Sequence, residues 1–304
     1  MADIGIMKKK TLSLKTPAKI NLFLKVAGRR DDGYHNLETV FLPLTNIFDT
    51  IKLKIDEQEG IKITSLSEDI PCNKSNLCYK AAEQYALKIG IVPNWGIDID
   101  KRIPVTAGMG GGSSDAAAVL IMLQNFYDNT MEEKELVSLA AKIGADVPFF
   151  LNPVPSAGYG IGDILKPVEV NCDFYVLICA PQFPVTASWA YKNMVNPCVC
   201  EKLNIDELIS SLKSGEISTV LKFVKNDLAP ALYNKFPILS IFRDDLIRLG
   251  AEEAEITGSG PTIFGICKDK FSAEQIAAKM AEKYGSALKL AISSVLKEPY
   301  QVGS

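Results

Sequence analysis

A glycine-rich segment followed directly by a long apolar stretch is the feature that most limits how this chain can fold and act. Residues 104–120 read PVTAGMGGGSSDAAAVL, with glycine at 108, 110, 111 and 112. Glycines let backbone N–H groups approach a ligand without obstruction by Cβ atoms, and the apolar run predicts a buried helix. The N-terminus of such a helix attracts anions. The segment therefore predicts a phosphate-binding loop, although a flexible loop ahead of a buried helix explains the same letters equally well.

The spelling of this segment excludes the commoner nucleotide-binding motifs. No G-x-x-x-x-G-K-[ST] occurs in the chain, which excludes the P-loop. A dinucleotide-binding G-x-G-x-x-G would need glycine at position 113, where Ser113 stands instead. The H-R-D motif of protein kinases is also absent. If this segment binds phosphate, it does so with a motif other than those of P-loop proteins, dinucleotide-binding proteins and protein kinases.

Residues 16–41, TPAKINLFLKVAGRRDDGYHNLETVF, place polar side chains on an alternating apolar pattern. Lys19 and Asn21 are two positions apart, so on a strand both side chains face the same side. That face suits a polar or phosphate-bearing ligand, although these two residues alone favour a solvated strand face. The charged turn that follows ends in Tyr34 and His35, a pair that is more often structural than functional.

Two further segments combine glycine with polar groups. Asp146 lies in KIGADVPFFL, between a helix-ending glycine and an apolar stretch. Burial disfavours a charged carboxylate unless a cation pairs with it, and such pairs mark functional sites, although a turn or N-cap aspartate is the plainer explanation. Residues 257–265, TGSGPTIFG, form a second glycine turn between two predicted strands. This turn would either close over a phosphate or make a tight hairpin.

Composition excludes several classes of function. Of the 304 residues, 47% are hydrophobic and 23% are charged, as in ordinary globular proteins, and the net charge of −3 argues against a nucleic-acid partner. The seven cysteines include no C-x-x-C, which favours reduced thiols over a disulfide framework. The single histidine, His35, excludes multi-histidine metal sites. No apolar run approaches the ~18 residues of a bilayer span, so we expect a cytoplasmic protein without a membrane partner.

Hydrophobic periodicity predicts a mixed α+β chain without the regular rhythm of βαβ units. We expect two domains, residues 10–165 and 166–300, divided near the proline-containing stretch 152–167. Residues 1–7 are expected to form an unstructured extension. The predicted strands are 10–26 (one bent strand or two), 37–44, 50–55, 95–102, 174–181, two within 251–267 and one near 287–295; the predicted helices are 75–90, 114–127, 132–143, 206–213, 217–225, 238–249 and 272–284.

Taken together, these segments resemble the GHMP kinase superfamily, which includes galactokinase and the homoserine, mevalonate and phosphomevalonate kinases. Its ATP loop is of the P-x-x-x-G-L-G-x-S-S type and is matched by PVTAGMGGGSSDAAA, with Met109 in place of the usual leucine. Residues 17–41 are similar, almost letter for letter, to the signature PAKINLFLxVxGRRxDGYHxLxTVF. That signature belongs to the kinases of 4-(cytidine 5′-diphospho)-2-C-methyl-D-erythritol, which also carry GADVPFF, an N-D-L (226–228 here) and G-S-G-P-T. The resemblance extends over about residues 10–295.

The resemblance implies a GHMP kinase fold of two α+β domains, an N-terminal ATP-binding domain and a C-terminal domain, with the active site in the cleft between them. It implies transfer of a phosphoryl group from ATP, with Mg²⁺, to the 2-hydroxyl of the small-molecule cytidyl substrate, giving the 2-phosphate and ADP in non-mevalonate isoprenoid biosynthesis. Asp146 matches the general base, Lys19 the lysine beside it, and Asn21 a residue of the same pocket. Tyr34 and His35 match residues that hold the cytosine.

The resemblance also assigns residues to ATP and to the far side of the cytosine. With a triphosphate on the glycine loop and Mg²⁺ bridging its oxygens, the Ser114 hydroxyl is the expected Mg²⁺ ligand. For the aromatic residue that completes the stack on cytosine, Phe183 is preferred over Trp189 and Tyr191. The residues expected to bind ATP are Asn76, Lys101, Pro104, Val105, Thr106, Ala107, Gly108, Met109, Gly110, Gly111, Gly112, Ser113 and Ser114, with Asn76 and Lys101 at the adenosine.

Two alternatives stay open. The chain could be another small-molecule kinase of the superfamily, acting on homoserine or a mevalonate, but those acceptors have no base for the D-G-Y-H segment to recognise. It could also be a non-catalytic nucleotide-binding module, since a fold does not fix an activity. Such a module could lose Lys19 or Asp146 without losing its shape, and both are present. A monomer and a homodimer are equally compatible with the sequence.

Overall fold

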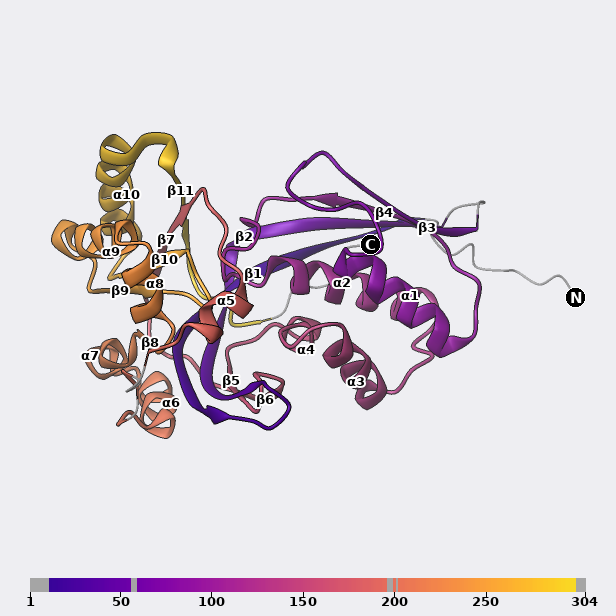
Figure 1. The fold of residues 1–304 in the computed structure, drawn as a ribbon, viewed down its shortest axis with the longest axis horizontal. Helices are drawn as coiled ribbons and strands as arrows, with labels where there is room; N and C mark the ends of the chain where they lie inside the picture. Colours follow the sequence, from indigo (N-terminus) through magenta and orange to yellow (C-terminus); the bar gives the residue numbers. More distant parts are fainter. Residues whose placement is uncertain (1–10, 56–58, 196–198, 201, 299–304) are drawn as a thin grey trace, which may run out of the picture.

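The computed structural model describes residues 11–55, 59–195, 199–200 and 202–298, so the extension expected at residues 1–7 lies outside the described residues. Two sheets with their helices make up the molecule, and the long strands β1 (Thr11–Arg29) and β2 (His35–Ile55) bend between its two halves (Figure 1). This mixture confirms the predicted α+β class. No helix among the described residues has the length and apolar character needed to cross a bilayer.

The first sheet is built around the antiparallel pair β1 and β2. The segment of β1 was predicted as one bent strand or two, and that of β2 as two separate strands. The pairing shifts register between Pro17 and Lys19, next to a proline that cannot donate to the ladder, and again between Asn21 and Phe23. These irregularities bend the strands without ending them. The strand order is β3-β4-β2-β1-β8, with β5 on β2 and β6 on β5; the remaining members are β3 (Gly60–Ser65), β4 (Asn94–Asp100), β5 (Ser156–Tyr159), β6 (Ile164–Pro167) and β8 (Lys225–Asn226).

Four helices pack against one face of this sheet. Helix α1 (Leu77–Ile89) begins at Asn76, whose side chain accepts a hydrogen bond from Cys78 N, and ends at Gly90 in the left-handed region, as predicted. Helix α2 (Gly111–Phe126) follows the glycine loop and is buried on most of its surface. A core cluster joins α1 and α2 to β2 and β4. The other two helices are α3 (Glu133–Ile143) and the short α4 (Val147–Leu151).

The second sheet has the order β11-β7-β10-β9, all antiparallel. One core cluster continues from this sheet into β1 and β2, and β8 pairs in parallel with Phe23 and Leu24 of β1. The two halves therefore share a sheet edge and a core. The elements are β7 (Tyr175–Pro181), α5 (Ala187–Lys192), α6 (Ile205–Ser214), α7 (Ile217–Val220), α8 (Ala229–Lys235), α9 (Ile238–Leu249), β9 (Glu253–Ile256), β10 (Ile263–Cys267), α10 (Lys270–Tyr284) and β11 (Leu288–Ser293), with 3₁₀ turns at Leu221–Phe223 and Gly285–Ala287.

The longer predicted elements are confirmed within a few residues, and the differences concern short or interrupted ones. The helix predicted over 217–225 ends at Val220, because the chain enters a 3₁₀ turn and then β8. The short helices α4, α5 and α8 were not predicted, because a run of five to seven residues shows too little periodicity to identify.

Candidate active site

A cavity of about 860 Å³ is lined by residues from both halves of the chain. Five of the six predicted catalytic and substrate-binding residues line it, although they come from two segments far apart in the chain, and residues of both glycine turns join them. The lining includes Lys19, Asn21, Tyr34, His35, Gly108, Gly110, Ser113, Asp146, Tyr191, Lys192, Gly258 and Ser259.

Lys19 and Asp146 form the polar centre of this cavity. The Lys19 ammonium lies 3.4 Å from Asp146 Oδ2; the Lys19 side chain is 4% exposed and that of Asp146 is 31% exposed. The Lys19 backbone N–H donates to Met109 O at 3.0 Å, which ties β1 to the glycine loop. Asp146 sits at the start of α4, where the chain turns after Gly144. The carboxylate is thus open to a ligand on one side and neutralised by a fixed cation on the other.

A buried chain of hydrogen bonds fixes the lysine. Lys19 Nζ donates to Asn21 Oδ1 at 2.6 Å, and Asn21 Nδ2 donates to Thr39 Oγ1 at 2.8 Å. Thr39 donates in turn to the carbonyl of Phe23 at 2.6 Å. The backbone N–H of Asn21 donates to Thr257 Oγ1 at 2.8 Å, so the second glycine turn is attached to the same strand. Thr39 was not among the predicted site residues, because its part depends on the β1–β2 pairing.

The glycine loop and the N-terminus of α2 form a second wall of the cavity. Gly108 and Gly110 have φ of +75° and +74°, a region that favours glycine. A Cβ on Gly110 would lie 2.7 Å from the Phe150 ring, and one on Gly108 would overlap the carbonyl of Thr257. The first turn of α2 contains no acidic residue. Its unpaired backbone N–H groups therefore present a site for an anion beside Ser113, which lines the cavity.

The second glycine turn is held in place by Asn226, a residue of the N-D-L motif. Asn226 is buried, and its side-chain amide donates to Ile256 O and Gly258 O, both at 2.8 Å. Its oxygen accepts from Leu228 N at 2.9 Å. Every polar atom of this side chain is thus engaged, and the turn that contains Gly258 is fixed against the glycine loop.

An aromatic pair lies at the other end of the cavity. The rings of His35 and Tyr191 are stacked, with centroids 5.4 Å apart and planes at 17°, and Tyr34 beside them is 60% exposed. Burial, and to a smaller extent Arg29, lower the pKa of His35, so the imidazole is neutral at neutral pH. Burial and the nearby Asp146 raise the pKa of Tyr191, so its hydroxyl stays protonated.

The structure does not support Phe183 as the aromatic partner of the cytosine site. Phe183 packs against Phe236, with ring centroids 5.1 Å apart, and Trp189 packs on the same ring at 5.8 Å. Neither lines the cavity, whereas Tyr191 does. Tyr191 and Trp189 are two positions apart on α5, so only one of them faces the cavity, and the sequence alone did not show which.

The structure also argues against Ser114 as a metal ligand. Its side chain is fully buried, hydrogen-bonds to the Thr16 hydroxyl and donates to Pro17 O at 2.7 Å. Because α2 begins at Gly111, Ser113 and Ser114 point in different directions, and it is Ser113 that lines the cavity. No group of three or more His, Cys, Asp or Glu side chains within the described residues is placed to hold a metal ion.

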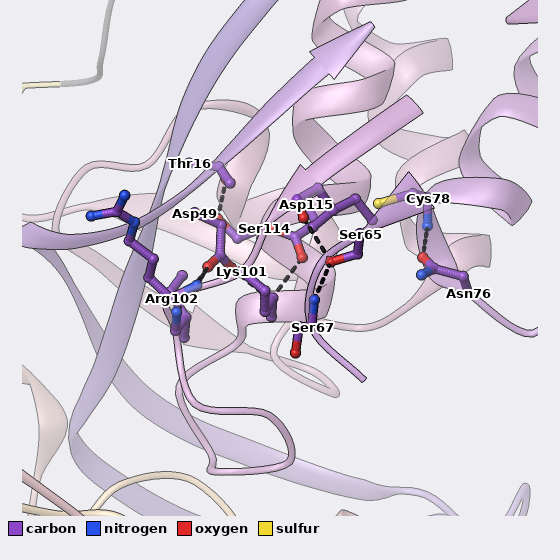
Figure 2. A network of polar contacts seen from close by, with 12 residues as sticks. Thr16, Asp49, Ser65, Ser67, Asn76, Cys78, Lys101, Arg102, Ser114 and Asp115 are labelled. Carbon is purple, nitrogen blue, oxygen red and sulfur yellow. Dashed lines mark hydrogen bonds and ion pairs between the residues drawn. The ribbon is translucent and has the colours of Figure 1, made fainter. Parts of the chain in front are cut away.

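Lys101 and Asn76 lie behind the glycine loop, in the polar network of Figure 2. Lys101 Nζ lies 2.6 Å from Asp49 and 2.7 Å from Asp115, with side chains at most 5% exposed. One ammonium cannot neutralise both carboxylates, and burial raises the pKa of Asp115 to about 7 despite Lys101. Burial opposes the charge of Lys101, but Asp115 and Asp49 raise its pKa above the ordinary value.

The side chains of Asn76 and Lys101 are therefore both engaged within the protein, the former in capping α1. Their assignment to the adenosine stays a prediction. The same holds for the other residues of the predicted loop, of which only Gly108, Gly110 and Ser113 line the cavity. Gly111 faces Lys101 and Ile103 instead, since a Cβ there would lie 2.8 Å from Lys101 Nζ. The other residues predicted to bind ATP that do not line the cavity are Pro104, Val105, Thr106, Ala107, Met109 and Gly112.

Comparison with known proteins agrees with this arrangement. Residues 76–152 match the family described as GHMP kinases N terminal domain, and residues 197–286 match GHMP kinases C terminal. The 4-diphosphocytidyl-2-C-methyl-D-erythritol kinase of Alkaliphilus metalliredigens is 37% identical over 260 residues, which are 86% of this chain and 89% of the relative. The kinase of the same name from Clostridium kluyveri is 38% identical over 271 residues, covering 89% and 96%.

Solved structures show the same fold. A crystal structure of a 4-(cytidine 5′-diphospho)-2C-methyl-D-erythritol kinase is similar with a TM-score of 0.78 at 30% identity, covering 93% of this chain and 99% of the other. A homoserine kinase from Cytophaga hutchinsonii has a TM-score of 0.80 at 19% identity and covers 98% of each chain. The second likeness concerns the fold alone.

Proposed function

The chain belongs to the 4-diphosphocytidyl-2-C-methyl-D-erythritol kinase family of the GHMP kinases, and we propose that it transfers the γ-phosphoryl group of ATP to the 2-hydroxyl of 4-(cytidine 5′-diphospho)-2-C-methyl-D-erythritol. The products are the 2-phosphate and ADP, in the non-mevalonate route to isoprenoids. One observation carries the proposal for this chain: a single cavity holds the Lys19–Asp146 pair, an anion-binding helix N-terminus and a stacked aromatic pair.

Asp146 is the proposed general base. Its exposed side accepts the proton of the substrate hydroxyl as the oxygen attacks the γ-phosphorus and the bond to the β-phosphate oxygen breaks. Lys19 lies 3.4 Å away and is held by Asn21. A cation so placed balances the charge of the carboxylate and stabilises negative charge on the transferring group. Lys19 is fixed on β1 and Asp146 at the start of α4, which limits their motion relative to the attacking hydroxyl.

The N-terminal turn of α2 is the proposed site of the ATP phosphates. Backbone N–H groups from a glycine loop and a helix N-terminus bind phosphate oxygens without a counter-charge of their own. Mg²⁺ fits this site as an ion that is carried mainly by nucleotide phosphates, since the described residues offer no protein cage for it. When bound, it would neutralise phosphate charge, and the hydroxyl of Ser113 in the cavity lining is a candidate ligand.

The aromatic end of the cavity is the proposed site of the cytosine. A flat base can stack beside this aromatic group of Tyr34, His35 and Tyr191, and its donor–acceptor edge suits a neutral imidazole. Homoserine and mevalonate have no base to occupy these rings. This substrate class favours an enzyme of the cytoplasm, because ATP and cytidine nucleotides are available there. We also retain residue 165 as the approximate proposed boundary between the two domains.

The decisive experiment is an acceptor comparison. We expect ADP formation from ATP with the cytidyl-diphosphate methylerythritol, and background rates with homoserine and mevalonate. Mass spectrometry should place one added phosphate on the cytidyl substrate. Turnover of homoserine or mevalonate at a comparable rate would overturn the assigned acceptor, and ATP binding without turnover of any acceptor would favour a non-catalytic module.

A further inference from the structure

Two cationic side chains of the cavity have no partner of their own. Arg29 and Lys192 line the same cavity as Lys19 and Asp146. Throughout the part of the chain that the structure describes, neither of them forms an ion pair or a side-chain hydrogen bond. Both residues are exposed at the wall of the cavity, where an unpaired cation attracts an anionic ligand.

The other charges of the cavity leave these two cations uncompensated. Lys19 and Asp146 neutralise each other at 3.4 Å. Asp32, the remaining carboxylate of the lining, is paired with Arg30 at 2.9 Å and also accepts a hydrogen bond from Tyr34 N. Two positive charges therefore remain in excess in the lining of the cavity.

Their positions bracket the aromatic pair. Arg29 is the register partner of His35 across β1 and β2, and it is close enough to lower the pKa of that imidazole. Lys192 follows Tyr191 at the end of α5. Each ring of the stack thus has a cation next to it in the chain or across the strand pair. Asp146 is close enough to raise the pKa of Tyr191, so the aromatic pair, the two cations and the carboxylate line the same cavity.

We propose that Arg29 and Lys192 form the diphosphate subsite for the cytidyl substrate, separate from the glycine loop that binds the ATP phosphates. The inference rests on the proposed function. The ligand that fits is a pyrimidine nucleoside diphosphate ester, whose base and reacting hydroxyl are separated by two negatively charged phosphates. A guanidinium can bind two phosphate oxygens at once, and an ammonium can bind one from the opposite wall.

The test compares two ligands that differ only in the diphosphate. Binding of CDP and of cytidine is measured by calorimetry for the wild type, Arg29→Gln and Lys192→Gln. We expect each variant to weaken CDP roughly 5- to 30-fold while cytidine changes less than about twofold, because cytidine does not reach the subsite. Lys192→Arg should restore most of the CDP affinity, and added salt should reduce the preference of the wild type for CDP over cytidine.

Arg30→Gln is the matched control. Arg30 follows Arg29 in the chain but is paired with Asp32 and does not line this cavity, so the affinity for CDP should stay near that of the wild type. Equal losses for CDP and cytidine in the two variants would overturn the subsite in favour of a packing role. A rise in the KM of ATP with CDP binding unchanged would assign the cations to the triphosphate instead.

The subsite and the proposed function fail in different ways. A wild type that phosphorylates the cytidyl substrate but binds CDP no better than cytidine overturns the subsite alone. A wild type that binds CDP much better than cytidine through Arg29 and Lys192, yet does not phosphorylate the substrate, supports the subsite and overturns the assigned activity.

Discussion

A Cβ on Gly258 would stand 2.8 Å from the carbonyl oxygen of Gly108, so the two glycine turns of the cavity touch backbone to backbone. Both residues have positive φ, +54° and +75°. The contact joins a turn of the second half to the loop that precedes α2. The shape of the proposed phosphate site therefore depends on a turn about 150 residues away in the chain.

Gly258→Ala should lower the Tm and raise the KM of ATP, because the side chain strains the turn and pushes the two loops apart. Gly112→Ala serves as the stability control, since its Cβ would meet only Leu77 at 3.7 Å, and its Tm should match the wild type. Thermal unfolding and the KM of ATP are the measurements. A Gly258→Ala protein with normal KM and Tm would show that the backbone contact is dispensable.

Asp146→Asn should lower kcat by at least ~10²-fold while leaving the KM of ATP near normal, because the amide cannot take the proton of the substrate hydroxyl. The overall fold should be retained, since the Asp146 side chain is 31% exposed and makes no capping hydrogen bond. Steady-state kinetics check the prediction, with the Tm as control. Activity within a few-fold of the wild type would reassign Asp146 to a purely structural turn.

Tyr191→Ala should raise the KM of the cytidyl substrate, since loss of a base–aromatic stack costs on the order of 1–3 kcal/mol, or roughly 5- to 150-fold. Tyr191→Phe keeps the ring and should be close to the wild type. Phe183→Ala is the comparison: it removes a contact with Phe236 and should lower the Tm more than it affects the substrate KM. The reverse order of effects would restore Phe183 as the stacking residue.

His35 should titrate below its ordinary value of 6.5, because burial and Arg29 both disfavour the charged ring. As the only histidine, it gives a single imidazole signal to follow by NMR. The affinity for CDP should stay constant from neutral pH upward and change only as the ring protonates below its folded pKa. Addition of CDP should shift the signal, whereas a shift with an ATP analogue alone would mean that the two nucleotide pockets are interchanged.

Because Asp115 is buried beside Lys101 and Asp49, we expect its contribution to the stability of the fold to decrease as the pH rises. The pKa of Asp115 is raised from 3.8 to about 7 in the folded protein, so the folded state holds a proton that the unfolded state releases. The contribution of this group to stability is therefore greatest below pH 4 and is lost as pH rises to 7. The Tm of the wild type minus that of Asp115→Asn should fall over this range and then level off. A difference that grows with pH would contradict the raised pKa.

The sequence predicted those parts of the fold and site that depend on local pattern. Asn76 and Gly90 mark the ends of α1 because capping is local chemistry, and Lys19, Asn21 and Asp146 stand in recognisable segments. Ser113 and Ser114 were not distinguished, because the first residue of α2 decides which hydroxyl turns inward.

The remaining site residues depend on tertiary packing. Choosing Tyr191 over Phe183 required knowing which face of the short α5 meets His35. The role of Thr39 could be identified only from the β1–β2 register, which places it opposite Leu24, where its hydroxyl accepts a hydrogen bond from Asn21. Asp49 and Asp115 are 66 positions apart (49 to 115) and share Lys101 only because β2 and α2 pack together.

The parallel pairing of β8 with Phe23 and Leu24 has a consequence for how the protein is assembled. Without β8, this part of β1 would be an open sheet edge, able to recruit a strand from another molecule. The buried Asp227 carboxylate reinforces the closure by accepting from Val26 N and Cys200 N, at 2.7 and 2.8 Å. This edge therefore stays unpaired until Lys225 and Asn226 have been synthesised, and a chain that ended before them would lack the strand that covers it.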